Sequence, residues 1–386
     1  MRGHPRAESG QRRAGRAPAR PAAAHVFGRL RAQQLLASGC ATPAGVVSRL
    51  LALQAQNPVA ARWAVGIRLS GDAPGERAVE RALAEGAILR IHALRWTWQL
   101  VCPADARWLL ALVSPGLDRR HAPRYRELGL DAAAFRRSRA AIERALRGGE
   151  QLTRAELAEA LARSGVRATG PVLSHLLARA ELQGVLCSGA PRGKVATYAL
   201  LELRAPGARP ALTREEALAE LARRYFESRG PATLADLTWW AGLTLGEARA
   251  GLEAVRSRLV SEVARGERYF SGQGPGRWPG DGAAPRALLL PAFDEYLLAY
   301  RDRTLVLDER LARRINAGGG MLGPCVVVDG RVVGTWRRTL RRRIVEVELG
   351  LLEPVSSRAG QAIEAAAARY GEFLGLEARV SSRGRA

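Results

Sequence analysis

The sequence predicts an α+β protein in which three winged helix-turn-helix units are followed by a small β-rich C-terminal domain. A pattern of helices followed by a β-hairpin occurs three times, and this order is typical of the winged variant of the helix-turn-helix. A Gly/Pro-rich stretch, SGQGPGRWPGDGAAP, then precedes segments typical of strands. We expect a disordered basic tail at 1–25, a first unit with a linker helix at 26–149, further units at 150–210 and 211–272, and the C-terminal domain at 273–380.

The first unit begins with apolar residues at helical spacing from Val26 to about Leu69. Thr42-Pro43 and Asn57-Pro58 each set a capping side chain before a proline, which is typical of a helix start. A short helix is expected at Ala78 to Glu85. The stretch Ile88 to Val101, ILRIHALRWTWQLV, has the composition of a hairpin or wing.

The same order returns twice. In the second unit, Thr153 and Glu156 form a capping box at the start of the first helix. A helix at Gly170 to Glu181 and two strands around the turn SGAPRGKVAT complete it. The third unit is predicted to begin with a helix at Arg214 to Arg229 and to end with a β segment at Leu259 to Phe270. Between them, Thr233 is expected to cap a helix at Leu234 to Gly242, and Thr244 one at Leu245 to Arg256.

The C-terminal domain is predicted to be mainly β-structure with one helix packed against it. Asp329-Gly330 is a signal for a tight hairpin turn, and the helix covers Ser357 to Leu374. The strands are expected at Ala287 to Leu290, Val326 to Asp329, Arg331 to Arg337 and Ile344 to Leu349.

The formal net charge of +23 predicts a polyanionic partner. Lys194 is the only lysine, so nearly all the positive charge comes from arginine. Part of the charge excess is therefore attributed to a compositional bias towards arginine and not to a polyanionic partner. No apolar run approaches the roughly 20 residues that span a bilayer, and the first 24 residues contain no apolar signal region. These features favour a cytoplasmic, nucleoid-associated protein that does not contact a membrane.

Metal and redox chemistry are not indicated. The cysteines lack CxxC spacing and the histidines form no HxxxH or His/Cys cluster. We therefore expect reduced, mostly buried thiols, no zinc site and no cofactor. These residues are Cys40, Cys102, Cys187 and Cys325, and His4, His25, His92, His121 and His175.

Three stretches resemble the AlkZ/YcaQ-like winged-helix DNA glycosylase family. They are LLALQAQNPVAARWAVGIRL (50–69), GPATLADLTWWAGLTLGEAR (230–249) and LLLPAFDEYLLAYRDRTLVLD (288–308), the last followed by INAGGG and VVVDGRVVGTWRR. The similarity extends over about residues 27–375. It implies a C-shaped scaffold of three winged helices, a basic concave face for duplex DNA and excision of N-alkylated purines. The family's catalytic motif stands here as Gln54-Ala55-Gln56. A glutamine at the last position implies the AlkZ-like branch, associated with bulky lesions and interstrand crosslinks.

The first wing departs from the family pattern. Relatives have a segment like RGTLHLV, whereas this chain has Arg95-Trp96-Thr97-Trp98-Gln99-Leu100-Val101. Trp96 therefore replaces a glycine, and Gln99 replaces a histidine. If that histidine assists binding or catalysis, the activity of this chain is altered or lost.

Two glutamines can orient a water molecule but cannot act as a true general base, because an amide does not titrate near neutral pH. Orientation suffices when the leaving group is a cationic purine and the transition state resembles an oxocarbenium ion. Because Asn57-Pro58 interrupts the helical pattern, we expect Gln54 to end one helix and Gln56 to lie in the following turn, where the side chains converge. The alternative is that both glutamines only cap helix ends.

The candidate DNA contacts lie on the first two wings. Trp96 and Trp98 alternate along a predicted strand and are expected on one face, to stack on a base or to pack in the core. Arg192 and Lys194 fit phosphate contacts or a solvated turn. Arg95 completes the DNA-binding set. Asp294 and Glu295 are expected to form an ion-pair network with their neighbours Arg301, Asp302 and Arg303.

Two other functions remain open at this point. One is a non-catalytic winged-helix DNA-binding protein, such as a transcription regulator. The other is a resistance factor that sequesters a genotoxic product. A regulator usually binds spaced half-sites as a dimer, and the sequence contains no evident dimerisation helix, so we expect a monomer that binds double-stranded DNA containing alkylated purines.

Overall fold

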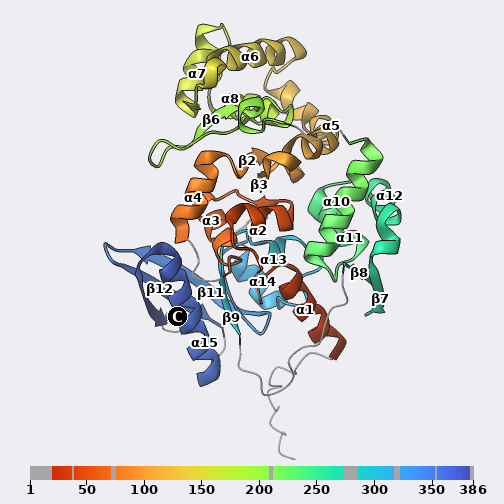
Figure 1. Cartoon of the computed structure of the whole chain (residues 1–386), viewed down its shortest axis with the longest axis vertical. Helices are drawn as coiled ribbons and strands as arrows, with labels where there is room; N and C mark the ends of the chain where they lie inside the picture. The colour runs from red at the N-terminus through yellow and green to blue at the C-terminus, as the bar shows by residue number, and fades with distance from the viewer. Residues whose placement is uncertain are drawn as a thin grey trace, which may run out of the picture.

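The computed structural model describes residues 20–36, 39–70, 75–207, 212–272, 286–316, 322–352 and 354–382. The molecule is elongated (Figure 1): the second hairpin unit forms one end, the C-terminal sheet forms the other, and the first and third units lie between them. Residues 1–19 of the predicted tail and 273–285 of the Gly/Pro-rich stretch lie outside the described residues. Residues 20–25, also assigned to the tail, instead belong to helix α1 (Arg20–Ala32).

The first unit contains α2 (Pro43–Leu50), α3 (Pro58–Gly66) and α4 (Gly75–Glu85). The predicted starts are confirmed, because the side chain of Thr42 accepts from the Gly45 N–H and that of Asn57 accepts from two N–H groups of α3. The predicted hairpin is also confirmed. It consists of β2 (Leu89–His92), the one-turn 3-10 helix η1 (Leu94–Trp96) and β3 (Trp98–Val101), and the short β1 (Leu53–Gln54) pairs with β3.

A long helix, α5 (Pro103–Glu127), connects the first unit to the second. The predicted capping box of Thr153 and Glu156 is present at the start of α7. The sheet has the strand order β4-β6-β5. The elements of this unit are α6 (Ala132–Ala145), β4 (Leu152–Thr153), α7 (Arg154–Arg163), α8 (Gly170–Leu182), β5 (Leu186–Ser188), β6 (Thr197–Leu200) and α9 (Leu201–Arg204).

The third unit follows the predicted order closely. Thr233 and Thr244 each form a capping box at a helix start, so the sequence signal and the helix boundary coincide. A two-stranded hairpin closes the unit. Its elements are α10 (Arg214–Arg229), α11 (Leu234–Ala241), α12 (Leu245–Val255), β7 (Val260–Ala264) and β8 (Glu267–Ser271).

The C-terminal region is a five-stranded sheet of order β13-β12-β11-β10-β9. The turn predicted at Asp329-Gly330 is confirmed, with φ of 47° and 76° at its two residues. The edge strand β13, which runs parallel to β12, was not predicted. The elements are β9 (Ala287–Leu290), α13 (Glu295–Leu298), α14 (Glu309–Ile315), β10 (Cys325–Val328), β11 (Arg331–Leu340), β12 (Ile344–Leu351), α15 (Ser357–Leu374) and β13 (Glu377–Ser382).

Three apolar cores hold these elements together, and they cross the boundaries of the sequence units. One joins α2, α3 and α4 to the C-terminal sheet and α15. A second joins the first hairpin and α5 to the third unit, and a third surrounds α6, α7 and α8. The first hairpin contributes residues to two of these cores. Its strands are therefore fixed by packing on both faces.

Candidate active site

The segment Gln54-Ala55-Gln56 is extended, not helical. Helix α2 ends at Leu50, and Leu51 has a left-handed φ of 65° that reverses the chain. Gln54 then lies in β1, in register with Gln99 of β3. The prediction that Gln54 ends a helix is therefore wrong. Gln56 does lie in the turn before α3, as predicted.

An extended backbone at Gln54 avoids the divergence that a helix would impose, and the convergence of the two glutamine side chains stays a prediction. Residues two apart in an extended segment face the same side, and the residue between them faces the other. Ala55 is fully buried in the core and Gln54 is buried at 8% exposure, whereas Gln56 is exposed. Neither glutamine caps α3, because Asn57 accepts from the first N–H groups of that helix.

The backbone of the segment is held from three directions. The Gln54 N–H donates to Oε1 of Glu295 at 3.1 Å. The Ala55 N–H donates to the Trp98 carbonyl at 2.7 Å, which continues the ladder with β3. Nε of Arg90 donates to the Ala55 carbonyl at 3.0 Å, with its guanidinium 4.0 Å above the Trp98 ring. The segment is thereby preorganised.

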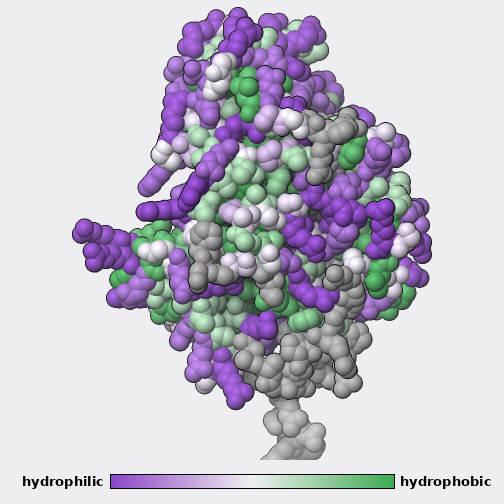
Figure 2. Space-filling model, in the orientation of Figure 1, coloured by the Kyte–Doolittle hydropathy of each residue, from purple (hydrophilic) through white to green (hydrophobic). Residues whose placement is uncertain are grey.

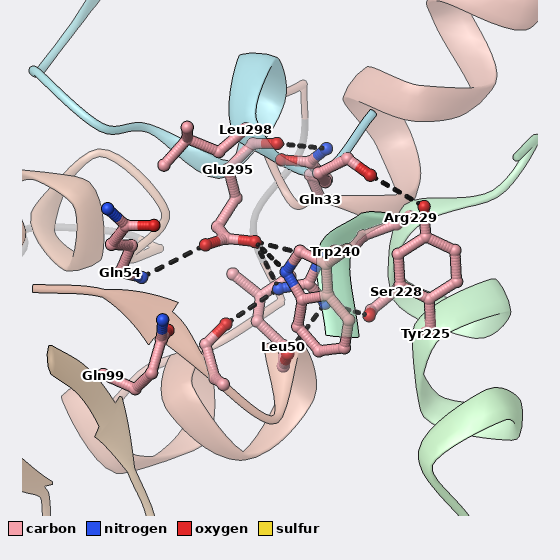
Figure 3. A network of polar contacts seen from close by, with 12 residues as sticks. Gln33, Leu50, Gln54, Gln99, Tyr225, Ser228, Arg229, Trp240, Glu295 and Leu298 are labelled. Carbon is pink, nitrogen blue, oxygen red and sulfur yellow. Dashed lines mark hydrogen bonds and ion pairs between the residues drawn. The ribbon is translucent and has the colours of Figure 1, made fainter. Parts of the chain in front are cut away.

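Glu295 is the centre of this support (Figure 3). Its Oε2 accepts from Arg229 Nη2 at 2.7 Å and from Trp240 Nε1 at 2.8 Å. Arg229 also donates to the carbonyls of Leu50 and Ala52, at 2.8 and 2.7 Å. The buried ion pair therefore joins α10 and α13 to both sides of the turn that leads into β1.

The neighbouring carboxylate, Asp294, forms a second buried pair. Both of its oxygens accept from Arg68 at 2.8 Å, and Oδ1 also accepts from the Tyr296 N–H at the start of α13. The prediction that Asp294 and Glu295 form ion pairs is confirmed, but the partners predicted for them are wrong. The arginines are Arg68 and Arg229, far away in sequence, and not the adjacent Arg301 and Arg303.

Arg95 has its hydrogen-bond partners inside the protein. Its Nη2 donates to Oε1 of Gln54 at 2.8 Å, and its Nη1 donates to the Trp240 carbonyl. Burial lowers the pKa of this guanidinium, while the carboxylate of Glu295 raises it. Arg95 thus orients the Gln54 amide and brings a cation to within hydrogen-bond distance of it.

Trp96 and Trp98 do not share a strand face, so that prediction is wrong. Trp96 belongs to η1 and has φ of 63°, in the left-handed region that favours glycine. Its ring stacks on His121 at 3.8 Å between centroids. Trp98 lies in β3, with the His92 ring at 4.2 Å. Both rings are partly buried against protein groups.

The second hairpin turn is exposed. Arg192 and Val195 are bonded to each other across Gly193 and Lys194, and Gly193 has φ of 59°. Arg192 Nη1 donates to Glu156 Oε1 at 2.7 Å, and this bond, together with the capping-box bonds from Thr153, lowers the pKa of the Glu156 carboxyl to about 2. Arg192 is exposed despite this ion pair, and Lys194 is exposed as well.

Sequence reasoning missed the contacts that hold the motif, and it did not single out Arg90 or Arg229. Arg229, Arg90 and Glu295 lie far from Gln54 in sequence and meet it only in the folded chain. A local signal existed only for Glu295, an acidic residue within the apolar run LLLPAFDEYLLAY. A carboxylate in such a run needs a buried cationic partner, but the sequence does not indicate which one.

Two features are absent from the described residues. Within them, no three His, Cys, Asp or Glu side chains are arranged so that they could hold a metal ion. Their helices also include none that is both long and apolar enough to cross a membrane.

Comparisons with known proteins identify the family and the fold. The sequence model of the family described as DNA glycosylase AlkZ-like matches residues 47–373. An interstrand DNA cross-link repair glycosylase from Streptomyces sahachiroi is 27% identical over 312 residues, which cover 75% of this chain and 81% of that protein. The solved structure of Streptomyces sahachiroi DNA glycosylase AlkZ has the same fold, with a TM-score of 0.77, 23% identity, and coverage of 93% of this chain and 99% of that chain. Because the family match covers most of its length, the chain belongs to the AlkZ-like DNA glycosylase family.

Proposed function

We propose that this DNA glycosylase excises purines alkylated at N7 or N3 from duplex DNA, by attack of a water molecule at C1′ of the sugar. Gln54 and Gln56 orient the water. The observation on which the proposal chiefly depends is that the backbone of Gln54 and Ala55 is hydrogen-bonded to Glu295, Trp98 and Arg90, directly before Gln56. A site that only orients a water molecule depends on such fixed geometry.

The chemistry suits amide side chains. An alkylated purine bears a positive charge, so its bond to the sugar is already weakened and no strong base is needed. The sugar becomes positively charged as that bond breaks, and amide oxygens directed at it stabilise this charge. The proposed reaction uses no metal and no cofactor, and EDTA is expected to leave the rate unchanged.

In this proposal the three helix-and-hairpin units are winged helices that bind duplex DNA with a basic surface. Hydrophilic side chains project at the left of Figure 2 from the second hairpin and from the β11–β12 hairpin, and the net charge of +23 has the sign that phosphates require. The curated relative's name makes an interstrand crosslink a candidate substrate here too. We infer that the enzyme acts as a monomer on the chromosome in the cytoplasm.

The direct test uses duplex DNA containing N7-methylguanine, followed by alkaline cleavage of abasic sites. We expect excision by the wild-type protein. Gln54→Ala and Gln56→Ala should each slow single-turnover excision by about 100-fold, with the duplex dissociation constant little changed. Gln56 is exposed, so Gln56→Ala should keep the melting temperature, whereas Gln54→Ala should lower it because Arg95 loses an acceptor. Gln56→Asp should retain or increase the rate, because a carboxylate adds negative charge facing the sugar.

Two outcomes would contradict the proposal. Tight duplex binding without excision would favour the non-catalytic DNA-binding alternative. Unchanged excision in both alanine variants would show that the glutamines do not orient the water.

A further inference from the structure

Gln99 is a buried glutamine with one unpaired atom. Its side chain is 1% exposed, and its Nε2 donates to Oγ1 of Thr97 at 2.8 Å. Thr97 Oγ1 in turn donates to the Leu94 carbonyl at 3.0 Å, so the amide is held from its nitrogen end. Its Oε1 is buried and has no hydrogen-bond partner among the described residues. An unpaired buried acceptor has lost its hydrogen bonds to water without gaining one in the protein, so a native protein rarely retains one without a use for it.

The position of Gln99 indicates what that use is. Gln99 and Gln54 are directly opposite each other in the antiparallel pair of β3 and β1. Opposite residues in such a pair extend from the same face of the sheet, with Cβ atoms about 4.5–5.5 Å apart. In Figure 3 the side chain of Gln99 rises from its strand towards Gln54. The unpaired oxygen therefore belongs to the face of the sheet that presents the catalytic motif.

The two facing glutamines differ as acceptors. Oε1 of Gln54 already accepts from the guanidinium of Arg95 at 2.8 Å. A cation at this distance draws electron density from the oxygen and opposes positive charge nearby. Oε1 of Gln99 has no such donor. Of the two, Gln99 offers the stronger free acceptor.

We propose that the side-chain oxygen of Gln99 accepts a hydrogen bond from the attacking water, as a third glutamine of the site. This inference rests on the function proposed above. The water oxygen forms the bond to C1′, and the electron pair of the C1′–N bond leaves with the purine and neutralises its charge. One of the two water protons stays on the new hydroxyl group at C1′, and the other passes to solvent. Gln99 takes no proton and only directs the water's lone pair at C1′.

The first test is Gln99→Leu, which removes the acceptor and keeps a side chain of similar size. Removing an unpaired buried acceptor should leave the melting temperature unchanged or raise it. Single-turnover excision of N7-methylguanine should fall by about 10- to 100-fold, while the duplex dissociation constant stays the same. A gain in stability together with a loss of rate is typical of a polar group kept for function.

Gln33→Leu is the matched control for stability. Gln33 is also fully buried, but both ends of its amide are bonded: Nε2 donates to the Tyr300 hydroxyl at 2.9 Å and Oε1 accepts from Arg68 at 3.2 Å. The same substitution there leaves partners unpaired and should lower the melting temperature. If Gln99→Leu lowers it as much as Gln33→Leu does, Gln99 is a structural residue and the inference is wrong.

Gln99→Glu adds a readout that a structural role would not change. The Gln99 amide does not ionise near neutral pH, so this side chain should give the wild-type rate no pH dependence. The variant should gain a rate that rises with pH as the new carboxyl ionises, above its ordinary range because burial raises its pKa. A Gln99→Leu enzyme that excises at the wild-type rate would overturn the inference alone, whereas a wild-type protein that does not excise N7-methylguanine would overturn the proposed function itself.

Discussion

The first and second hairpins have the same order of elements but opposite environments. The turn of the first hairpin faces the interior, where Arg95 bonds to Gln54 and Trp96 stacks on His121. The turn of the second hairpin faces solvent, with Val195 54% exposed and Arg192 paired only at the surface, with Glu156 and the Gln151 carbonyl. The first hairpin therefore forms a wall of the candidate site, and the turn of the second is exposed to a partner. Equivalent secondary structure does not imply an equivalent role.

The largest difference between the two hairpins is expected in how much each contributes to the free energy of unfolding. Trp96→Ala removes a ring packed against His121, and we expect a loss of about 2 kcal/mol in the free energy of unfolding, below the 3–5 typical of fully buried aromatics because Trp96 is only partly buried. Val195→Ala in the second hairpin should change it by less than about 0.5 kcal/mol. Denaturant unfolding measures both. Equal losses would mean that the two hairpins contribute alike to the core.

The next effect concerns catalysis. Arg95→Met removes the donor that orients the Gln54 amide, and we expect single-turnover excision to fall by about 10-fold, less than for loss of a glutamine. The fall is limited because the variant also removes a cation near the developing positive charge. Arg192→Met is the matched control and should excise at the wild-type rate. A faster Arg95→Met enzyme would mean that the electrostatic cost of Arg95 exceeds its orienting effect.

A smaller effect is expected in binding. If the second hairpin contacts phosphates, the double variant Arg192→Ala/Lys194→Ala should weaken duplex binding. It should also reduce the slope of log affinity against log salt by up to about 2, since each phosphate contact adds about 0.9. Titrations at several salt concentrations measure the slope. An unchanged slope would mean that this turn is solvated and does not contact DNA.

The smallest effect concerns pH. Burial lowers the pKa of both His121 and His175, which surround Trp96. A lowered histidine pKa means that protonation favours the unfolded chain. This contribution to stability is full above the ordinary value of about 6.5 and is lost as the pH falls below it. His121→Phe, which keeps a ring under Trp96, should reduce the fall in melting temperature between pH 7 and 5.

The second hairpin should respond in a different pH window. The pKa of Glu156 is lowered to about 2 by its bond to Arg192. A lowered carboxyl pKa stabilises the fold above the ordinary value and loses this effect as the pH falls towards 2. Glu156→Gln should therefore leave the profile between pH 7 and 5 unchanged. A change of the same size in both variants would contradict the separation of the two hairpins.

The sequence by itself determined the elements whose signals are local. Thr42, Asn57, Thr153, Thr233 and Thr244 cap the helices at which they were predicted, because a cap involves only the next three residues. The tight turn at Asp329-Gly330 and the three hairpins follow from the same kind of short-range preference. The motif Gln54-Ala55-Gln56 was identified by resemblance, and its catalytic role stays a prediction.

Only the tertiary structure decided how that motif is presented. Local rules predicted a helix end at Gln54, but pairing of β1 with β3 and the buried bond to Glu295 keep the segment extended. The tertiary structure also decided that Glu295 pairs with Arg229 and that Arg95 bonds to Gln54, because each contact joins residues far apart in the chain. A buried charge must find an opposite charge or a donor. Which one it finds depends on how the three cores bring distant elements together, and no local pattern contains that information.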